Sequence, residues 1–224
     1  MFIGHYAPAF FAATRAPHKK PILKLWQAFL AVQLLDFIFG ILVLLGIEQM
    51  RVEPQAFTFI PYSHSLVFAC FWACLSAMTF KTLTKQSYWS GAILFGILVI
   101  SHWFTDLIMH EPDLTLWPGS EKFGWSLGHG SAVSPIIEIV FLLVSVFYLL
   151  AFSKIRAFKK SIFFILLVVS MITLQWVSHV TTVPATPFAF VMQMMGVLIF
   201  LILGAAFSEK SLFDVPVSRE GPAP

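Results

Sequence analysis

The stretch GAILFGILVISHWFTDLIMHEPD, residues 91–113, is apolar for its first ten positions and then acquires a run of ionisable side chains. His102, Asp106 and His110 recur every four residues, so on a helix they line one face. Asp113, eleven residues after His102, returns close to that face if the helix continues. Ionisable groups inside a membrane are costly unless they are paired or bind an ion, and they mark functional sites. We therefore interpret this group as part of a metal site.

The composition of the whole chain is that of a membrane protein. Of the 224 residues, 58% are hydrophobic and 11% are charged, whereas a soluble domain carries roughly 25% charged residues. Six apolar segments have the roughly 20 residues that a membrane-crossing helix needs. They lie at about 22–47, 62–83, 88–109, 132–152, 161–180 and 185–207. The sequence thus predicts an all-α, polytopic fold, with one integral membrane domain over residues 1–208 and a short cytoplasmic tail over 209–224.

The basic residues predict how the chain is oriented in the membrane. Six crossings return the C-terminus to the side on which the first crossing begins. Most of the 14 lysines and arginines fall in the segments of that side: Arg15, Lys19, Lys20, Lys24, Lys81, Lys85, Lys154, Arg156, Lys159, Lys160, Lys210 and Arg219. Only Arg51 and Lys122 fall on the other side, so the positive-inside rule places both termini in the cytoplasm. Because topology alone accounts for these charges, they do not predict nucleic-acid binding.

The segment before the first span is apolar but only about half as long as a span. A helix that ends near Arg15 at the cytoplasmic face rises about 1.5 Å per residue, which carries His5 about 15 Å into the membrane. Such a re-entrant helix is tolerated where protein surrounds it. The alternative is an interfacial helix that lies flat on the cytoplasmic leaflet and leaves His5 remote from the other polar residues.

Donor side chains from four separate segments are expected at compatible depths, toward the outer face. They are His5, Asp36, His64, His102 and Asp106. A hydrolytic zinc site needs three or more His, Asp or Glu ligands and an open position for water, whose pKa the ion lowers. His102 and Asp106 lie one helical turn apart, a workable spacing for two ligands of one ion. We predict a divalent cation, with Zn²⁺ favoured, bound by this set, and His110 as an additional candidate ligand.

Several of these residues also have plain structural explanations. Asp36 can carry a proton or pair with a histidine, and His64 can cap the second span at the water interface. His110 and Asp113 fall at the aqueous boundary, where polar side chains are ordinary. Glu138 lies about two turns into the fourth span, which is too deep for a surface charge. We interpret Glu138 as a candidate catalytic base or as a residue that orients a ligand, and Asp113 as a candidate catalytic group that moves protons.

The order of short motifs resembles that of a known family. Gly4-His5, then Asp36, then Ser63-His64-Ser65-Leu66, then Ser101-His102 with Asp106 four residues on, and finally Leu116-Trp117-Pro118 follow one another along residues 3–118. This order is similar to that of a bacterial inner-membrane family of metal-dependent hydrolases of the SOS-induced, LexA-regulated type. That family typically has a GH, a PDxDH-like, a THSL and an SHxxxD element. The resemblance implies a bacterial inner-membrane location, a hydrolytic activity, and His5, Asp36, His64, His102 and Asp106 as metal-site residues. The chain departs from the family in having a single aspartate, Asp36, at the PDxDH-like position.

These observations favour an integral membrane hydrolase with an outward-facing metal site. A site at that depth suits an amphiphile whose head is cleaved while its tail stays among the membrane lipids, which makes a lipid-like ester, phosphoester or amide the expected substrate. One alternative is a proton-coupled transporter, in which Asp36, His102, Asp106 and Glu138 form a relay. Another is a non-catalytic membrane partner protein that keeps a structural metal.

Overall fold

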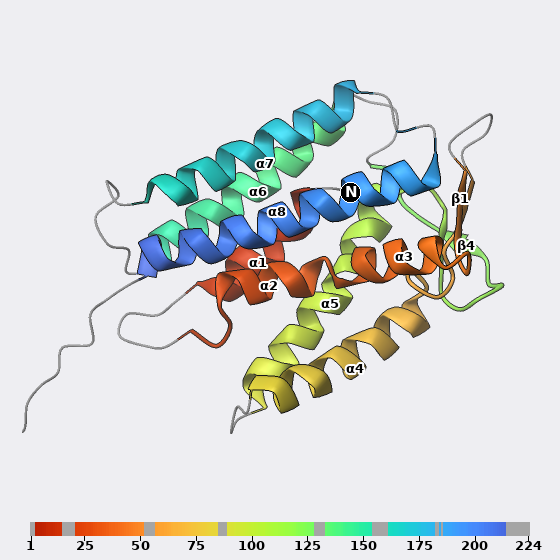
Figure 1. The fold of residues 1–224 in the computed structure, drawn as a ribbon, viewed down its shortest axis with the longest axis horizontal. Helices are drawn as coiled ribbons and strands as arrows, with labels where there is room; N and C mark the ends of the chain where they lie inside the picture. The colour runs from red at the N-terminus through yellow and green to blue at the C-terminus, as the bar shows by residue number, and fades with distance from the viewer. Residues whose placement is uncertain are drawn as a thin grey trace, which may run out of the picture.

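The computed structural model describes residues 3–14, 21–51, 57–84, 89–127, 133–153, 161–181, 184 and 186–213. These residues form a helical bundle with two small hairpins at one end (Figure 1). In chain order the elements are η1 (Ile3–His5), α1 (Tyr6–Ala13), α2 (Leu25–Val32), α3 (Leu34–Leu44), β1 (Gln49–Arg51), β2 (Phe57–Phe59), α4 (Leu66–Thr84), α5 (Ser90–Met109), β3 (Leu114–Thr115), β4 (Lys122–Phe123), α6 (Val133–Phe152), α7 (Ile162–Val180) and α8 (Pro187–Phe213).

The predicted all-α membrane fold is confirmed. Five helices (α4 to α8) are each long and apolar enough to cross a membrane, and α2 with α3 makes a sixth span if the bent pair is counted as one. The helix α8 continues to Phe213, five residues beyond the predicted end of the membrane domain. Residues 214–224 of the predicted tail lie outside the described part of the chain.

The first span is broken at Gln33. The axes of α2 and α3 differ by 49°, and Gln33 has φ −108° and ψ 5°, outside the helical region. A break in a membrane helix is tolerated where protein covers the freed backbone groups, and Gln33 is fully buried. The break puts Asp36 in the first turn of α3 and frees the carbonyl of Val32 to meet a side chain from α5.

The N-terminal segment is buried inside the bundle. Most of its apolar residues, including Ile3, Tyr6 and Phe10, are fully buried, whereas Phe11 is 37% exposed. The ring of Phe10 contacts Phe29 of α2 and Phe164 of α7. His5 is 1% exposed. The interfacial alternative would leave His5 remote from the other polar residues, whereas its Nε2 lies 3.1 Å from Asp106 Oδ1, as the re-entrant placement requires. Protein covers most of this short helix, which is the condition under which a half-span is stable.

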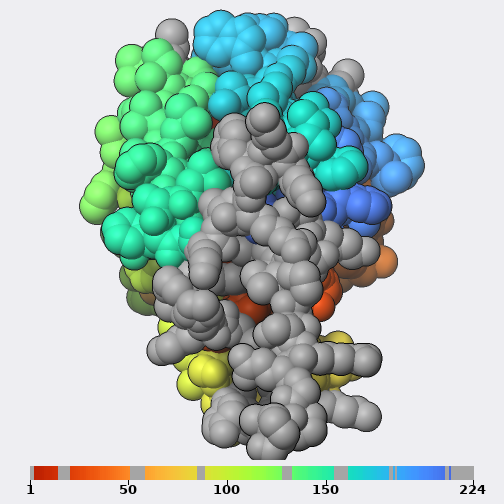
Figure 2. All heavy atoms as spheres, turned by 90° about the vertical axis from the view of Figure 1, so that its left-hand side faces the viewer, coloured from red at the N-terminus to blue at the C-terminus, as the bar shows by residue number. Residues whose placement is uncertain are grey.

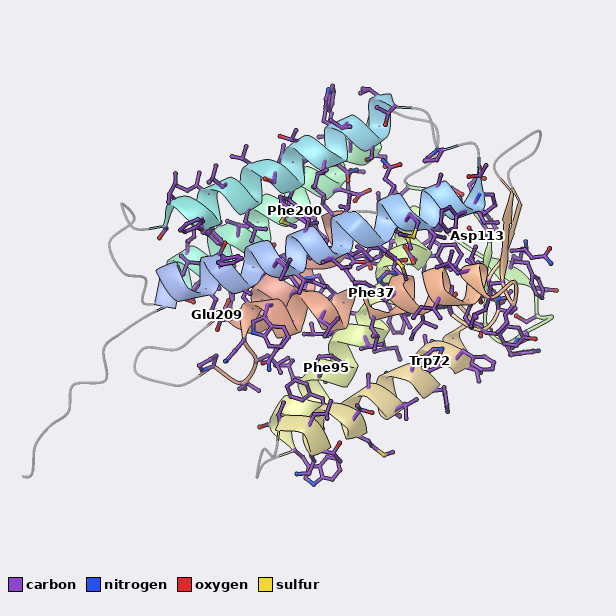
Figure 3. The ribbon with its side chains drawn as sticks, in the orientation of Figure 1. Phe37, Trp72, Phe95, Asp113, Phe200 and Glu209 are labelled. Carbon is purple, nitrogen blue, oxygen red and sulfur yellow. The ribbon has the colours of Figure 1, made fainter. Side chains whose placement is uncertain are left out.

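The two ends of the bundle differ in character. Both hairpins lie at one end, and α2 begins and α8 ends at the other (Figure 1). Seen from that second end, α6 and α7 lie on one side of the molecule and α4 on the opposite side (Figure 2). Asp113 and Glu209 mark the two ends (Figure 3), and Glu209 accepts a hydrogen bond from the Leu25 N–H at the start of α2. Many of the basic residues that predict the orientation lie outside the described residues: Arg15, Lys19, Lys20, Lys85, Lys154, Arg156, Lys159, Lys160 and Arg219.

The loop after α5 folds back over the end of that helix. Residues 110–127 carry β3 and β4, and the N–H groups of Trp125 and Ser126 donate to the carbonyls of Leu107 and His110. Gly124 allows this return, because a Cβ there would collide with the backbone of Glu111. This loop therefore lies against the helix that carries His102 and Asp106.

Candidate metal centre

The structure brings the predicted donors together from four parts of the chain. His5 ends η1, Asp36 lies in the first turn of α3, and His64 precedes α4. His102 and Asp106 lie on α5, the central helix, 56% of whose hydrophobic window is buried. His5, His64, His102 and Asp106 are each at most 5% exposed, so the cluster lies inside the bundle and not on its surface.

Asp106 lies at the middle of the cluster. Its Oδ1 is 3.1 Å from His5 Nε2 and 3.1 Å from His110 Nε2. Its Oδ2 is 3.2 Å from His102 Nε2 and 3.7 Å from His64 Nε2. One carboxylate thus faces four imidazoles, two with each oxygen.

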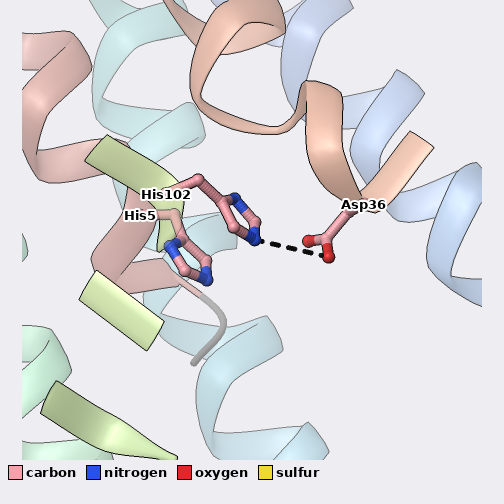
Figure 4. Close-up of side chains that lie close together, drawn as sticks. All are labelled: His5, Asp36 and His102. Atoms are coloured by element: carbon pink, nitrogen blue, oxygen red, sulfur yellow. Dashed lines mark ion pairs between the residues drawn. The ribbon is translucent and has the colours of Figure 1, made fainter. Parts of the chain in front are cut away.

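Asp36 closes the cluster from the side of α3. Its Oδ1 lies 3.5 Å from both His102 Nε2 and His64 Nε2. Figure 4 shows His102 pointing at this carboxylate, with the ring of His5 beside it. The His5 and His102 rings are stacked, with centroids 3.8 Å apart and planes within 6°. Two sets of three donors have all their ligand atoms within 4.8 Å of one another: His5, Asp36 and His102, and His64, His102 and Asp106.

The hydrogen bonds at the far side of two rings decide where their protons lie. His102 Nδ1 is 2.6 Å from the carbonyl of Val32, which can only accept, so His102 carries its proton on Nδ1. His5 Nδ1 is 2.6 Å from the Thr105 hydroxyl. That hydroxyl is 2.8 Å from the carbonyl of His102, to which it must donate, so it accepts from His5 Nδ1. Both rings therefore present an unprotonated Nε2 toward the carboxylates when they are neutral.

His64 also carries its proton on Nδ1, and here a serine hydroxyl connects the ring to a carboxylate. Its Nδ1 is 2.7 Å from the Ser63 hydroxyl, which donates to the Glu48 carboxylate at 2.6 Å. Ser63 therefore accepts from His64 Nδ1, and His64 also presents Nε2 to Asp36 and Asp106. Ligand histidines in metal proteins usually donate the proton of the other ring nitrogen in this way, which fixes the tautomer and the ring orientation.

The distances fit a shared cation better than direct hydrogen bonds. Charge-assisted N–H···O bonds are about 2.7–2.9 Å long, shorter than the 3.1–3.7 Å observed here between Nε2 and carboxylate oxygens. Donors about 2.0–2.1 Å from a tetrahedral zinc ion lie about 3.3–3.4 Å apart. His102 Nε2 has no hydrogen-bond partner among the described residues. Three neutral imidazoles and two carboxylates carry a charge of −2, which one divalent cation neutralises. The residues present therefore fit a divalent metal ion.

A pocket opens from the donors toward α7 and α8. Its volume is about 420 Å³, and Asp36, His64, Asp106, His110 and Asp113 line its polar end. The walls on the other side are largely apolar and include Leu174, Val177, Phe190, Met194 and Leu198. A small molecule can thus meet the polar cluster with one end and the apolar helices with the other.

His110 and Asp113 form a pair at the polar end of the pocket. His110 lies just beyond α5, and its Nδ1 is 3.3 Å from Asp113 Oδ1. The nearby Asp106 carboxylate raises the pKa of His110 to about 9. His110, with a side chain that is 30% exposed, can exchange protons with the pocket, which the buried histidines cannot do as readily.

Glu138 has a hydrogen-bond partner that the sequence did not identify. Its carboxylate accepts a hydrogen bond from the Gly4 N–H at 3.1 Å, and Gln175 of α7 accepts one from the Ile3 N–H at 3.3 Å. Both side chains hold the N-terminal segment that carries His5. Of the described residues, those that line the pocket do not include Glu138, so its position favours holding His5 over catalysis.

Sequence reasoning missed the residues that support the histidines. The sequence predicted no part in the site for Thr105, Ser63 or Glu48. Glu48 is 1% exposed. No signal in the sequence links Glu48 to Ser63, because the two residues lie 15 positions apart and meet only once the loop is folded.

The chain belongs to the YdjM inner membrane protein family, whose family model matches residues 61–181, more than half of its length. This match confirms the predicted inner-membrane family and makes the chain a multi-pass inner membrane protein. It spans His64, His102 and Asp106, whereas His5 and Asp36 precede it. Neither the curated proteins nor the solved structures include a significant match.

Proposed function

We propose that this member of the family is a hydrolase that depends on a divalent cation, Zn²⁺ by the chemistry of its donors. The residues that would hold the ion are His5, Asp36, His64, His102 and Asp106. The observation that carries the proposal is the common direction of three rings: each of the three histidines gives its Nδ1 proton to another partner and turns Nε2 toward the two carboxylates. Buried lone pairs that face buried anions repel one another, and a cation between them removes that cost.

The residues around the pocket suit hydrolysis. A bound zinc ion supplies Lewis acidity and lowers the pKa of a coordinated water toward neutrality. His110, held by Asp113, lies at the mouth of the donor cluster. Because its pKa is raised to about 9, its ring is protonated at neutral pH and can donate a proton to a leaving group. Asp113 thus acts through His110, and Glu138 acts by holding the segment that ends in His5.

The pocket supports an amphiphile as substrate. Its apolar walls come from α7 and α8, both helices that can cross the membrane, and its polar end carries the donors. A lipid-like ester, phosphoester or amide can place its tail against Leu174, Phe190 and Leu198 while its head reaches Asp106. Membrane lipids are therefore the proposed source of the substrate.

The proposed orientation has both termini in the cytoplasm and the site toward the periplasm. Among the described residues, Lys24 and Lys81 lie near the end of the bundle where α2 begins and α4 ends, opposite to the hairpins. A fluorescent protein fused to the C-terminus should fluoresce in cells, whereas a periplasmic alkaline phosphatase fused there should be inactive. The reverse pattern would contradict this orientation.

Metal analysis of detergent-purified protein tests the hydrolase proposal. Wild-type protein should retain about one zinc ion per chain, and His102→Ala should lose it. His179→Ala, which removes an exposed histidine of α7, serves as the matched control and should keep the metal. Ester, phosphoester and amide amphiphiles are then offered to metal-free and zinc-restored protein. Wild-type protein without stoichiometric metal would end the proposal, and metal-loaded protein inert on every substrate would favour the non-catalytic alternative.

A further inference from the structure

The three histidines differ in what lies behind them. The Nδ1 protons of His5 and His102 go to neutral acceptors, a threonine hydroxyl and a backbone carbonyl. The Nδ1 proton of His64 goes to Ser63, whose hydroxyl in turn donates to a carboxylate, that of Glu48. A carboxylate behind a ligand histidine fixes its tautomer and raises the basicity of the nitrogen that faces the metal.

Glu48 is held in a single orientation by the loop that carries His64. Its Oε1 accepts the N–H groups of Tyr62 and Ser63, both at 2.8 Å, and its Oε2 accepts the Ser63 hydroxyl at 2.6 Å. A carboxylate oxygen can only accept, so the Ser63 hydroxyl donates its proton to Glu48. Ser63 then has only a lone pair left for His64, and it accepts the proton of His64 Nδ1.

Two tryptophans fix the same loop from the other side. The Trp72 indole N–H donates to the carbonyl of Tyr62 at 2.8 Å, and the Trp103 indole N–H donates to the carbonyl of His64 at 2.9 Å. The backbone on both sides of Ser63 is therefore anchored to α4 and α5. With the backbone fixed, the proton arrangement among Glu48, Ser63 and His64 depends on the chemistry of residue 48.

We propose that Glu48 is a positioning residue of the metal site: through Ser63 it keeps the proton of His64 on Nδ1 and so leaves Nε2 free to bind a cation. The inference deepens the proposed function, since the cation is the one proposed there. The direction of the hydrogen bonds, however, is a property of the protein alone and can be measured without metal.

An isosteric substitution should reverse the relay. In Glu48→Gln the two backbone N–H groups hold the amide oxygen at the place of Oε1, which turns the NH₂ group toward Ser63. Ser63 must then accept from Gln and donate to His64 Nδ1, which moves the histidine proton to Nε2. The protonated Nε2 cannot bind a metal ion, so the affinity should fall although no ligand has been removed.

The first measurement is the tautomer of His64 in metal-free protein, by ¹⁵N NMR of histidine-labelled samples at a pH where this ring is neutral. His64→Gln identifies the signal by its absence. The wild type should show the Nδ1–H form and Glu48→Gln the Nε2–H form. Ser63→Ala, which removes the relay, should show a mixture, and Ser63→Thr, which keeps the hydroxyl, should restore the Nδ1–H form.

The second measurement is the zinc affinity of the same proteins, by competition with a chromophoric chelator. Glu48→Gln and Ser63→Ala should bind zinc about 10–100-fold more weakly than the wild type, the range found when a partner of a ligand is removed. Ser65→Ala is the matched control, because this neighbouring hydroxyl is buried without a hydrogen bond among the described residues, and its affinity should be unchanged.

The outcomes separate this inference from the proposed function. An unchanged Nδ1–H tautomer in Glu48→Gln and Ser63→Ala would overturn the role of Glu48, whatever the protein binds. If Glu48→Gln does not fold, the Ser63→Ala and Ser63→Thr pair decides the same question. A wild type with the expected tautomer but without zinc affinity would contradict the proposed function and leave the relay established.

Discussion

The neighbouring helices α4 and α5 have nearly the same length and hydropathy but opposite places in the bundle. They have 19 and 20 residues with mean hydropathies of 1.6 and 1.9, yet α4 is 17% buried and α5 is 56% buried over their hydrophobic windows. α4 presents Val67, Phe71 and Met78 outward, each more than half exposed, whereas α5 carries His102 and Asp106 inward. Hydropathy therefore identifies a span but does not tell which span is central.

Small residues and ionisable residues mark the central helix. Gly96 of α5 lies so close to α4 that an added Cβ would be 3.0 Å from the carbonyl oxygen of Ala73. Phe80 of α4 and Phe95 of α5 also stack, with ring centroids 4.8 Å apart. α5 therefore packs closely against α4 on one side and presents the polar residues of the site on the other. Substitutions in α5 should lower zinc affinity or stability more than substitutions on the exposed face of α4.

The largest loss of zinc affinity is expected on substitution of Asp106, whose carboxylate faces four histidines. Asp106→Asn keeps the size of the side chain but removes the charge, so zinc affinity should fall by more than about 100-fold, beyond the loss for removing a ligand's supporting partner. The chelator competition assay measures this. Glu121→Gln, at an exposed acid in the loop after α5, should leave the affinity unchanged. Equal affinities in the wild type and Asp106→Asn would remove Asp106 from the site.

The second prediction tests whether Glu138 supports the metal site by holding the N-terminal segment that carries His5. Glu138→Leu removes the acceptor of the Gly4 N–H, so it should weaken zinc binding about 10-fold by releasing His5. His5→Ala should weaken it at least as much, and the double variant should be no weaker than His5→Ala alone, because both act on one ligand. Additive losses would show that Glu138 acts independently of His5. Glu138→Gln, which keeps an oxygen acceptor, should retain zinc, and lost turnover in that variant would restore Glu138 as a catalytic base.

The six spans and the donor residues could be predicted from the sequence because each signal is local. A run of apolar residues defines a span, and His102 and Asp106 share a helix face by their spacing alone. The structure brings His5 to the same cluster, a point that the sequence left open because half a span can re-enter the membrane or lie on its surface. A supporting role for Glu138 was one of two interpretations, but its partner could not be predicted, because the Gly4 N–H lies 134 positions away.

The break at Gln33 shows a second limit. Residues 22–47 read as one continuous apolar segment, and Gln33 is the only polar side chain between Gln27 and Asp36 in the printed sequence. The bend follows from tertiary contacts, since His102 takes the carbonyl of Val32 and so replaces a bond within the helix. Such a replacement depends on the position of α5, which no property of residues 22–47 reveals.

The contact between α4 and α5 should affect stability more than metal binding. Gly96→Val places methyl groups against the backbone of Ala73, so it should lower the free energy of unfolding by about 1–3 kcal/mol, the usual cost of overpacking. Gly196→Val is the matched control on α8, where an added Cβ meets no described atom within 4 Å. Thermal unfolding in detergent compares the two. Equal stability of both variants would contradict the close packing of α4 on α5.

The smallest change in stability is expected from substitutions on the exposed face of α4. Cys70 and Cys74 lie one turn apart and are both exposed, without a disulfide, so they contribute neither to the core nor to the donor cluster. The double variant Cys70→Ser/Cys74→Ser should change the free energy of unfolding by no more than about 0.5 kcal/mol, as is usual for surface positions. Its zinc content should equal that of the wild type, because the imidazoles and carboxylates gathered by α5 complete the site without a thiolate. A loss of metal in this variant would mean that α4 takes part in the site, and the contrast between the two helices would fail.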